Sequence, residues 1–434
     1  MKIALLLAGL LVAVVTPAAA ADGVVHATLD NGLRVLLLED HRSPIASFQV
    51  WYRVGSRNER PGATGIAHFL EHMMFKGTPT HGPRQFSRLV EQNGGRDNAF
   101  TSQDVTSYYI NIAADRLPLV LDLEADRMQH LLLDPGDIAS ERQVVLEERR
   151  TRTDDDPSGF LSEEVSTLAF KAHPYGQPIL GWAEDVERIT PEAMRAFYRT
   201  YYVPNNAIVV AVGDFRAADI LDRIKQRFGG IPRGPDPPAV LAVEPPQNGE
   251  RRVVVQRQAE LPIVYLAYHV PSGASADAPA LDVLSTVLSG GRASRLYRAL
   301  VSDGQIALEA GGDYSFFMLD PYLFWFWATP LPGQKPETVE AALLAQMERL
   351  KTDPVNDEEL RRAKNQIEAE RVFAQDSVYQ RATQLAQFEL LGGYALDGKF
   401  LEKISAVTAA DLLRAARTYF PGDRKNVGIL LPKP

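Results

Sequence analysis

The sequence repeats itself at the ends of its two halves. The segment TPEAMRAFYRTYY (residues 190–202) aligns without gaps to TAADLLRAARTYF (residues 408–420), and each segment begins with a threonine suited to cap a helix. A strand-like run follows in both places. Chance recurrence of Arg-Thr before two aromatic residues is the alternative interpretation. We favour a duplicated domain, which limits the fold to two similar units in tandem.

Turn signals and hydrophobic periodicity predict antiparallel strands and segregated helices in the first half. The runs Val24 to Leu29 and Leu33 to Glu39 flank Asp-Asn-Gly, which favours a tight hairpin because Asn and Gly tolerate positive φ. The other predicted strands are residues 45–54, a second hairpin over 99–113 and a closing strand over 207–212; the predicted helices are residues 64–75, 85–92, 117–132, 138–151 and 191–200. This mixture indicates an α+β fold.

A stretch rich in Pro and Gly, GGIPRGPDPPAVLAVEPPQNGE (residues 229–250), separates the halves and is the best linker candidate. The second half repeats the first in outline, with strands near Val253, Ile263, Ile306 and Tyr322, a helix near Leu281, and long helices after Pro336 and Asp357. We therefore expect two tandem homologous α/β-sandwich domains, each an antiparallel-rich sheet with helices packed on it. The predicted ranges are 22–230, a linker over 231–250, and 251–434.

The N-terminus has the layout of a secretory signal peptide. Lys2 precedes an apolar run from Ile3 to Val15, which is too short to span a bilayer comfortably, and the run ends in the small residues Ala18 to Ala21. We expect residues 1–21 to be removed on export. An exported bacterial protein of this kind would most simply be periplasmic.

Composition excludes some classes of function without choosing one. The net charge of −9 argues against a general nucleic-acid binder. The chain has no cysteine, so it forms no disulfide and carries no lipid-bearing cysteine at the cleavage site.

The stretch GIAHFLEHMMF (residues 65–75) places three polar groups in an otherwise apolar helix. His68 and His72 are four residues apart, one turn along the same helix face, with Glu71 beside them. Burying these groups unpaired would cost roughly 1–3 kcal/mol or more each. A divalent metal would compensate, because two imidazoles at this spacing can share one ion while the glutamate reaches its water. The alternative is a histidine pair satisfied by ordinary hydrogen bonds.

A catalytic zinc site usually has a third protein ligand. The remaining six histidines have no partner at metal-binding spacing, whereas Glu141 and Glu148 are seven residues apart on one helix face. Only one of Glu147 and Glu148 can share the face of Glu141. We choose Glu148 as the third ligand and Glu141 as an acceptor that orients a ligand histidine. A solvated acidic helix face is the competing interpretation.

Four motifs in this order resemble the pitrilysin and insulysin family of inverted-motif zinc peptidases, over essentially the whole chain after the signal peptide. They are HFLEHMMFKGT (68–78), NAFTSQDVTSYY (98–109), ERQVVLEERR (141–150) and HPYGQPILG (173–181). The two-domain subfamily, which includes mitochondrial processing peptidase subunits and bacterial relatives, is the most similar in length.

The resemblance implies that His68, His72 and Glu148 bind one zinc ion per chain and that Glu71 activates the water. It also implies that substrate peptides add a strand along Asn98, Ala99 and Phe100; a hairpin strand alone would explain the same residues. The predicted activity is zinc-dependent hydrolysis of peptides or unfolded segments inside a chamber. Manganese or cobalt would suit the same ligand set.

One departure from the family concerns an Arg and a Tyr, seven residues apart, that hold the substrate carbonyl. The corresponding positions are Val301 and Leu308, while Arg298 and Tyr314 lie out of register. Losing oxyanion donors typically costs a factor of about 10²–10³ in rate. We therefore predict a heterodimer in which a homologous zinc-less subunit supplies the pair. A non-catalytic scaffold or peptide-holding subunit is the rival hypothesis.

Overall fold

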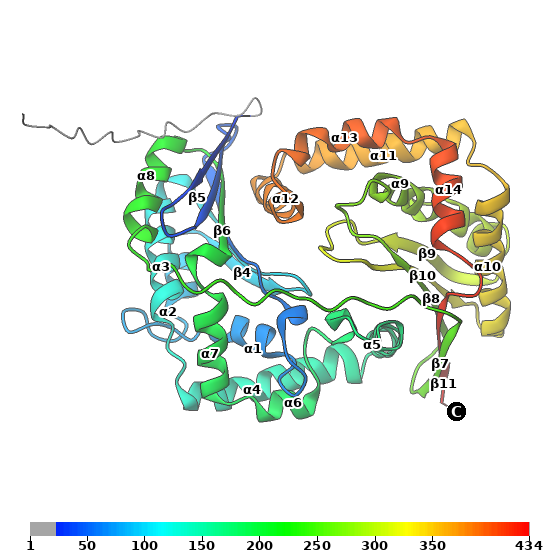
Figure 1. Ribbon diagram of the computed structural model, residues 1–434, viewed down its shortest axis with the longest axis horizontal. Coiled ribbons are helices and arrows are strands. Elements are labelled where there is room, and N and C mark those ends of the chain that lie inside the picture. The colour runs from blue at the N-terminus through cyan, green and yellow to red at the C-terminus, as the bar shows by residue number, and fades with distance from the viewer. Residues whose placement is uncertain (1–22, 434) are drawn as a thin grey trace, which may run out of the picture.

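The computed structural model describes residues 23–433, which form two halves joined by a long extended segment (Figure 1). The predicted signal peptide, residues 1–21, lies outside the described residues. Residues 231–250 contain no helix or strand, as expected for a linker. No helix among the described residues has the length and apolar character needed to cross a membrane.

The first half is built on a six-stranded sheet with the order β1-β2-β6-β3-β5-β4. Its strands are β1 (Val24–Thr28), β2 (Arg34–Glu39), β3 (Ile45–Tyr52), β4 (Arg96–Thr101), β5 (Thr106–Ala113) and β6 (Ala207–Gly213). All neighbouring pairs are antiparallel except β2 and β6, which are parallel. The predicted closing strand is confirmed as β6; it lies inside the sheet, between β2 and β3, and all seven of its residues are buried.

The second half repeats this sheet with the order β7-β11-β8-β10-β9. Its strands are β7 (Arg251–Arg257), β8 (Ile263–Val270), β9 (Ala307–Tyr314), β10 (Tyr322–Pro330) and β11 (Asn426–Pro432). Again the last strand in sequence enters the middle and pairs in parallel with the first, β7. Because β2-β6-β3-β5-β4 and β7-β11-β8-β10-β9 have the same order and directions, the duplication inferred from sequence is also a duplication of topology.

Helices cover one face of each sheet. On the first sheet they are α1 (Ile66–Met73), α2 (Gln85–Gln92), α3 (Leu117–His130), α4 (Pro135–Arg149), α6 (Ala183–Arg188), α7 (Pro191–Tyr201) and α8 (Ala217–Phe228); on the second they are α9 (Ala278–Ser289), α10 (Pro336–Thr352), α11 (Asp357–Ala374), α13 (Leu396–Ala406) and α14 (Ala409–Tyr419). The side chains of Thr190 and Thr408 accept hydrogen bonds from the backbone at the starts of α7 and α14. The predicted caps of the repeated segment are thus confirmed.

The opposite face of each sheet is covered by a helix from the other half. Helix α5 (Pro157–Ala169) packs Leu161 and Val165 on the second sheet, in a cluster with Leu323 and Leu430. Helix α12 (Val378–Leu391), which follows α11 in the second half, packs on the first sheet (Figure 1). The halves therefore complete each other's hydrophobic packing, which the sequence did not predict.

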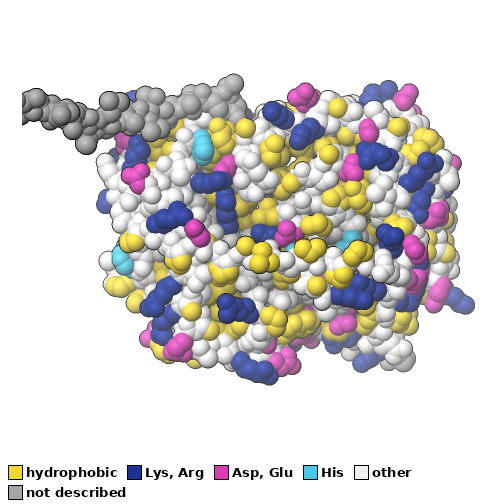
Figure 2. All heavy atoms as spheres, in the orientation of Figure 1, with side chains coloured by type: hydrophobic (Ala, Val, Ile, Leu, Met, Phe, Trp, Pro, Cys, Tyr) yellow, Lys and Arg dark blue, Asp and Glu magenta, His cyan; other side chains and the backbone are white. Residues whose placement is uncertain are grey.

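The cluster under α12 is formed by apolar side chains of both halves. Its most buried members are Val24, Leu36, Trp51, Ile208, Val210, Val212, Ala382, Leu385 and Ala386. On the outer surface, side chains of both charges are interspersed, and hydrophobic side chains run across the middle of the face in Figure 2, where the linker crosses. Leu241 and Val243 of this linker are 85% and 81% exposed.

Candidate metal centre

Helix α1 begins in a tight turn that fixes the position of its histidines. Gly65, at its N-cap, has a φ of +84°, and a Cβ atom there would lie 2.5 Å from the carbonyl oxygen of Leu180. The buried carboxylate of Glu59 accepts hydrogen bonds from the backbone nitrogens of Gly65 and Ala67, at 2.7 and 2.8 Å. An acceptor at this end satisfies backbone donors that the helix itself leaves unpaired.

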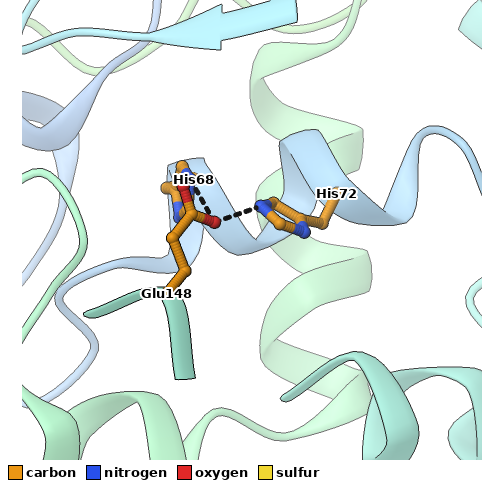
Figure 3. A group of neighbouring side chains, drawn as sticks. All are labelled: His68, His72 and Glu148. Carbon is orange, nitrogen blue, oxygen red and sulfur yellow. Dashed lines mark ion pairs between the residues drawn. The ribbon is translucent and has the colours of Figure 1, made fainter. Parts of the chain in front are cut away.

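The structure brings His68 and His72 of α1 against Glu148 of α4 (Figure 3). Oε2 of Glu148 lies 3.1 Å from Nε2 of His72 and 3.7 Å from Nε2 of His68. One ligand atom from each of the three side chains lies within 4.8 Å of the other two. Within residues 23–433, this is the one group of three such side chains with metal-ligand geometry.

Glu141 and Glu147 have different environments although both lie on α4. Glu141 is buried and its Oε1 lies 2.9 Å from Nδ1 of His72, while its other oxygen pairs with the ammonium of Lys76. The side chain of Glu147 is 58% exposed and pairs with Arg150. Of the two adjacent glutamates, Glu148 is the one that faces the histidines.

Burial and charge set the protonation of this group. Burial, followed by the neighbouring charge of His72, lowers the pKa of His68 to about 4. Burial opposes charge on His72 as well, but hydrogen bonds with Glu141 and Glu148 raise its pKa to about 9. The hydrogen bond from His72 lowers the pKa of Glu148. His68 is therefore an unprotonated nitrogen donor at neutral pH, and two imidazoles with a carboxylate form a donor set that fits a divalent ion.

Glu71 lies beside these three residues without being one of them. It is 9% exposed, and its Oε2 accepts a hydrogen bond of 2.5 Å from the hydroxyl of Thr101 on β4. Burial raises the pKa of its carboxyl group. A carboxylate with a raised pKa is a stronger base than an ordinary one, which suits Glu71 to accept a proton beside the candidate metal site.

A cavity of about 540 Å³ opens over the group. Its lining includes His68, His72, Glu148 and Glu71 together with Asn98, Ala99, Phe100 and Thr101 of β4. In the sheet order of the described residues β4 is an edge strand, paired with β5 on one side. The residues predicted to bind substrate therefore share one cavity with the predicted metal ligands.

Comparison with known proteins identifies the family. Residues 34–182 match the family described as insulinase (peptidase family M16), and residues 188–367 match the peptidase M16 inactive domain. The chain belongs to the M16 peptidase family. The resemblance to pitrilysin and insulysin is thus confirmed, and the expected two-domain fold is that of the family.

M16 relatives match over nearly their whole length. The zinc protease PqqE of Helicobacter pylori is 33% identical over 413 residues, covering 93% of this chain and 92% of the relative. The uncharacterized zinc protease YmxG of Bacillus subtilis is 27% identical over 400 residues, covering 91% and 95%.

Solved M16 structures agree with the fold described above. The crystal structure of a protease from Helicobacter pylori has a TM-score of 0.92 at 32% identity, covering 94% of this chain and 99% of that one. The periplasmic protease PqqL of Escherichia coli has a TM-score of 0.77 at 18% identity, covering 96% of this chain and 48% of that one; this likeness is one of fold.

The second M16 domain brings no oxyanion donor to the cavity within the described residues. Val301 packs against the second core, and Leu308 is 50% exposed on β9. The nearby Arg298 pairs with Asp303, and the hydroxyl of Tyr314 donates to the carbonyl oxygen of Pro271 at 2.9 Å. None of these four residues lines the cavity over the metal centre.

Sequence reasoning missed several residues of the site. Arg152 pairs with Oε1 of Glu148 at 2.8 Å and lies four residues after it, so helical charge spacing could have indicated the pair. Lys76 lies just beyond the C-terminal end of α1 and pairs with Glu141, so helical spacing does not indicate it. Glu59 and Thr101 come from separate segments, and no local spacing connects them to α1.

Proposed function

We propose that this chain is a zinc-dependent endopeptidase of the M16 family. The observation that carries the proposal is the meeting of His68, His72 and Glu148 in one cavity, with Glu71 beside them. Relatives are named zinc proteases, which supports the same metal and reaction class. Two imidazoles and one carboxylate leave room for water or substrate on a tetrahedral ion.

In this proposal His68, His72 and Glu148 hold the zinc ion, and the buried Glu141 orients the ring of His72 through its Nδ1 atom. The ion supplies Lewis-acid chemistry, lowering the pKa of water and polarising a carbonyl oxygen. Glu71 accepts the proton of the attacking water on its carboxylate. The same carboxyl group then gives the proton to the departing amine. The hydroxyl of Thr101 holds Glu71 in position through the bond to Oε2.

Peptides would bind by adding a strand to the free edge of β4, along Asn98, Ala99 and Phe100. Backbone hydrogen bonds are available from any peptide, so this mode suits a peptidase with broad sequence preference. Thr101, at the end of the same strand, contacts Glu71. An extended peptide on β4 would thereby pass close to the proposed zinc site.

We further propose that activity requires a homologous zinc-less subunit that supplies an Arg/Tyr pair. The cavity lining contains neither Arg298 nor Tyr314. Two two-domain chains would then enclose a chamber that admits peptides or unfolded segments. The predicted signal peptide would export the complex to the periplasm, and the structural relative PqqL of Escherichia coli is a periplasmic protease.

A scaffold or peptide-holding role is the second candidate, because the oxyanion pair is missing at Val301 and Leu308. The zinc content of the purified protein distinguishes the peptidase from the scaffold. The peptidase requires about one zinc per chain, lost in His68→Ala, whereas a folded, zinc-free wild type would support the scaffold.

The decisive experiment is digestion of a peptide library by the wild type and by Glu71→Gln, each with and without a related zinc-less chain from the same organism. We expect hydrolysis by the wild type with its partner and little by Glu71→Gln, because the amide of glutamine cannot accept the proton of the attacking water. Hydrolysis retained by Glu71→Gln would remove this residue from its role. Full activity of the wild type alone would refute the heterodimer and leave the peptidase assignment standing.

A further inference from the structure

A second cavity, of about 400 Å³, lies on the second sheet away from the metal centre. Four aromatic rings line it, from Tyr265, Tyr322, Trp325 and Trp327. Strand β10 explains this concentration, because its alternate residues Phe324, Phe326 and Ala328 are buried in the second core while its tryptophans face the other way.

Two carboxylates of the neighbouring strand β9, Glu309 and Asp313, line the same cavity. Glu309 accepts a hydrogen bond of 2.9 Å from the hydroxyl of Thr329, and the hydroxyl of Ser315 lies 3.5 Å from Asp313. Among residues 23–433, neither carboxylate has an ion pair with a Lys, Arg or His side chain within 4.0 Å. Both are more than a third exposed and therefore available to a ligand.

Rings and carboxylates together select one chemical class of ligand. Aromatic faces attract a cation, and within the described part of the chain no guanidinium lies over any of these four rings. An apolar ligand would cover the rings but would leave Glu309 and Asp313 desolvated without a partner, which is costly. A lysine or arginine side chain satisfies both features at once.

The aromatic cavity and the cavity over the metal centre both share lining residues with a cavity that neighbours them. A third cavity, of about 290 Å³, shares Arg152, Ile179 and Leu180 with the cavity over the metal site. It also shares Ser162 and Tyr322 with the aromatic cavity. The three cavities are therefore neighbours, and their lining residues extend from β4 to β10.

We propose that the aromatic cavity is a subsite for a basic side chain of the peptide whose scissile bond lies at the metal centre. The proposal rests on the peptidase function and adds a substrate class to it: peptides with a lysine or arginine at a fixed distance from the cleaved bond. The four rings hold the side chain, and Glu309 and Asp313 neutralise its charge.

Binding tests this subsite without requiring hydrolysis. Fluorescein-labelled peptides that carry one arginine at successive positions are titrated into the full chain with Glu71→Gln, and matched peptides carry citrulline, the neutral isostere. At one position we expect arginine to bind about tenfold more tightly than citrulline. The preference should disappear in Glu309→Gln/Asp313→Asn and weaken in Trp327→Leu, with little change for the citrulline peptide.

The control is Glu402→Gln/Asp423→Asn, which makes the same change in net charge at exposed positions elsewhere. It should keep the full arginine preference. Equal binding of the two peptides at every position, or a preference that survives Glu309→Gln/Asp313→Asn, would overturn the subsite. If the peptidase function itself fails, no peptide is cleaved by the wild type with its partner, yet the binding difference is still measured.

Discussion

Nδ1 of His72 lies 2.9 Å from Oε1 of Glu141, a residue on a different helix. The bond leaves Nε2 of the same ring facing Glu148, 3.1 Å away. Glu141 therefore fixes which nitrogen of His72 is presented to the proposed ion. Glu141 and Glu148 therefore have different roles, although they lie on the same helix: Glu141 orients the ring of His72, and Glu148 faces the nitrogen that would bind the ion.

The first prediction concerns Glu141→Gln. Losing the carboxylate that orients His72 should weaken zinc binding by about 10–100-fold. Competition with a chromogenic chelator measures the affinity. Glu147→Gln is the matched control, since Glu147 is exposed on the same helix and pairs with Arg150. Equal losses in the two variants would mean that net charge, and not orientation, controls affinity.

The second prediction tests the exchange of helices between the halves. Leu385 of α12 is fully buried on the first sheet, so Leu385→Ala should lower the free energy of unfolding by about 2–5 kcal/mol. Denaturant unfolding followed by tryptophan fluorescence measures the change. Leu241→Ala, at an 85% exposed linker position, should leave stability nearly unchanged. A wild-type-like Leu385→Ala would show that α12 does not hold the halves together.

The third prediction concerns the close approach of α5 to β11. A Cβ atom added to Gly428 would lie 2.2 Å from Cγ2 of Val165, so Gly428→Ala should destabilise the chain by about 1–3 kcal/mol. Val165→Ala makes space at this contact, and the double variant should lose less stability than the sum of the single variants. Thermal unfolding of the wild type, the two single variants and the double variant measures this coupling. Simple additivity would argue against this contact.

The fourth prediction is a pH dependence of stability. Burial, followed by the charges of Asp313 and Glu370, raises the pKa of Asp282 to about 7 from an ordinary value of 3.8. Between these values the unfolded chain loses a proton that the folded chain keeps, so stability falls as pH rises through this window and then levels off.

Asp282→Asn should therefore be more stable than the wild type at pH 8, by on the order of 2–4 kcal/mol, and the advantage should vanish near pH 4. Urea unfolding at several pH values measures the difference. Asp423→Asn changes an exposed carboxylate and should show no such trend. A constant difference between Asp282→Asn and the wild type across the pH range would contradict the assignment.

Local sequence predicted much of the candidate site because helical geometry alone orients the residues. His68 and His72 share a face at i and i+4, and Glu141 and Glu148 share a face two turns apart. In the structure both pairs keep this arrangement, and α1 and α4 lie together so that His68 and His72 face Glu148. Helix boundaries were less accurate: α4 starts at Pro135, and the chain after Arg149 widens into a π-helical turn, Arg150–Asp154.

The sequence by itself indicated the duplicated domain, the linker and the spacing of the metal-binding candidates, since these depend on short-range periodicity and on repeats. Only the tertiary structure decided that Glu148 faces His68 and His72, and that α5 and α12 cross to the opposite sheets. It also decided that the aromatic cavity and the cavity over the metal centre share lining residues with the same third cavity. These features join segments far apart in the sequence, such as Trp51 and Leu385, and their contacts depend on packing that no local pattern encodes.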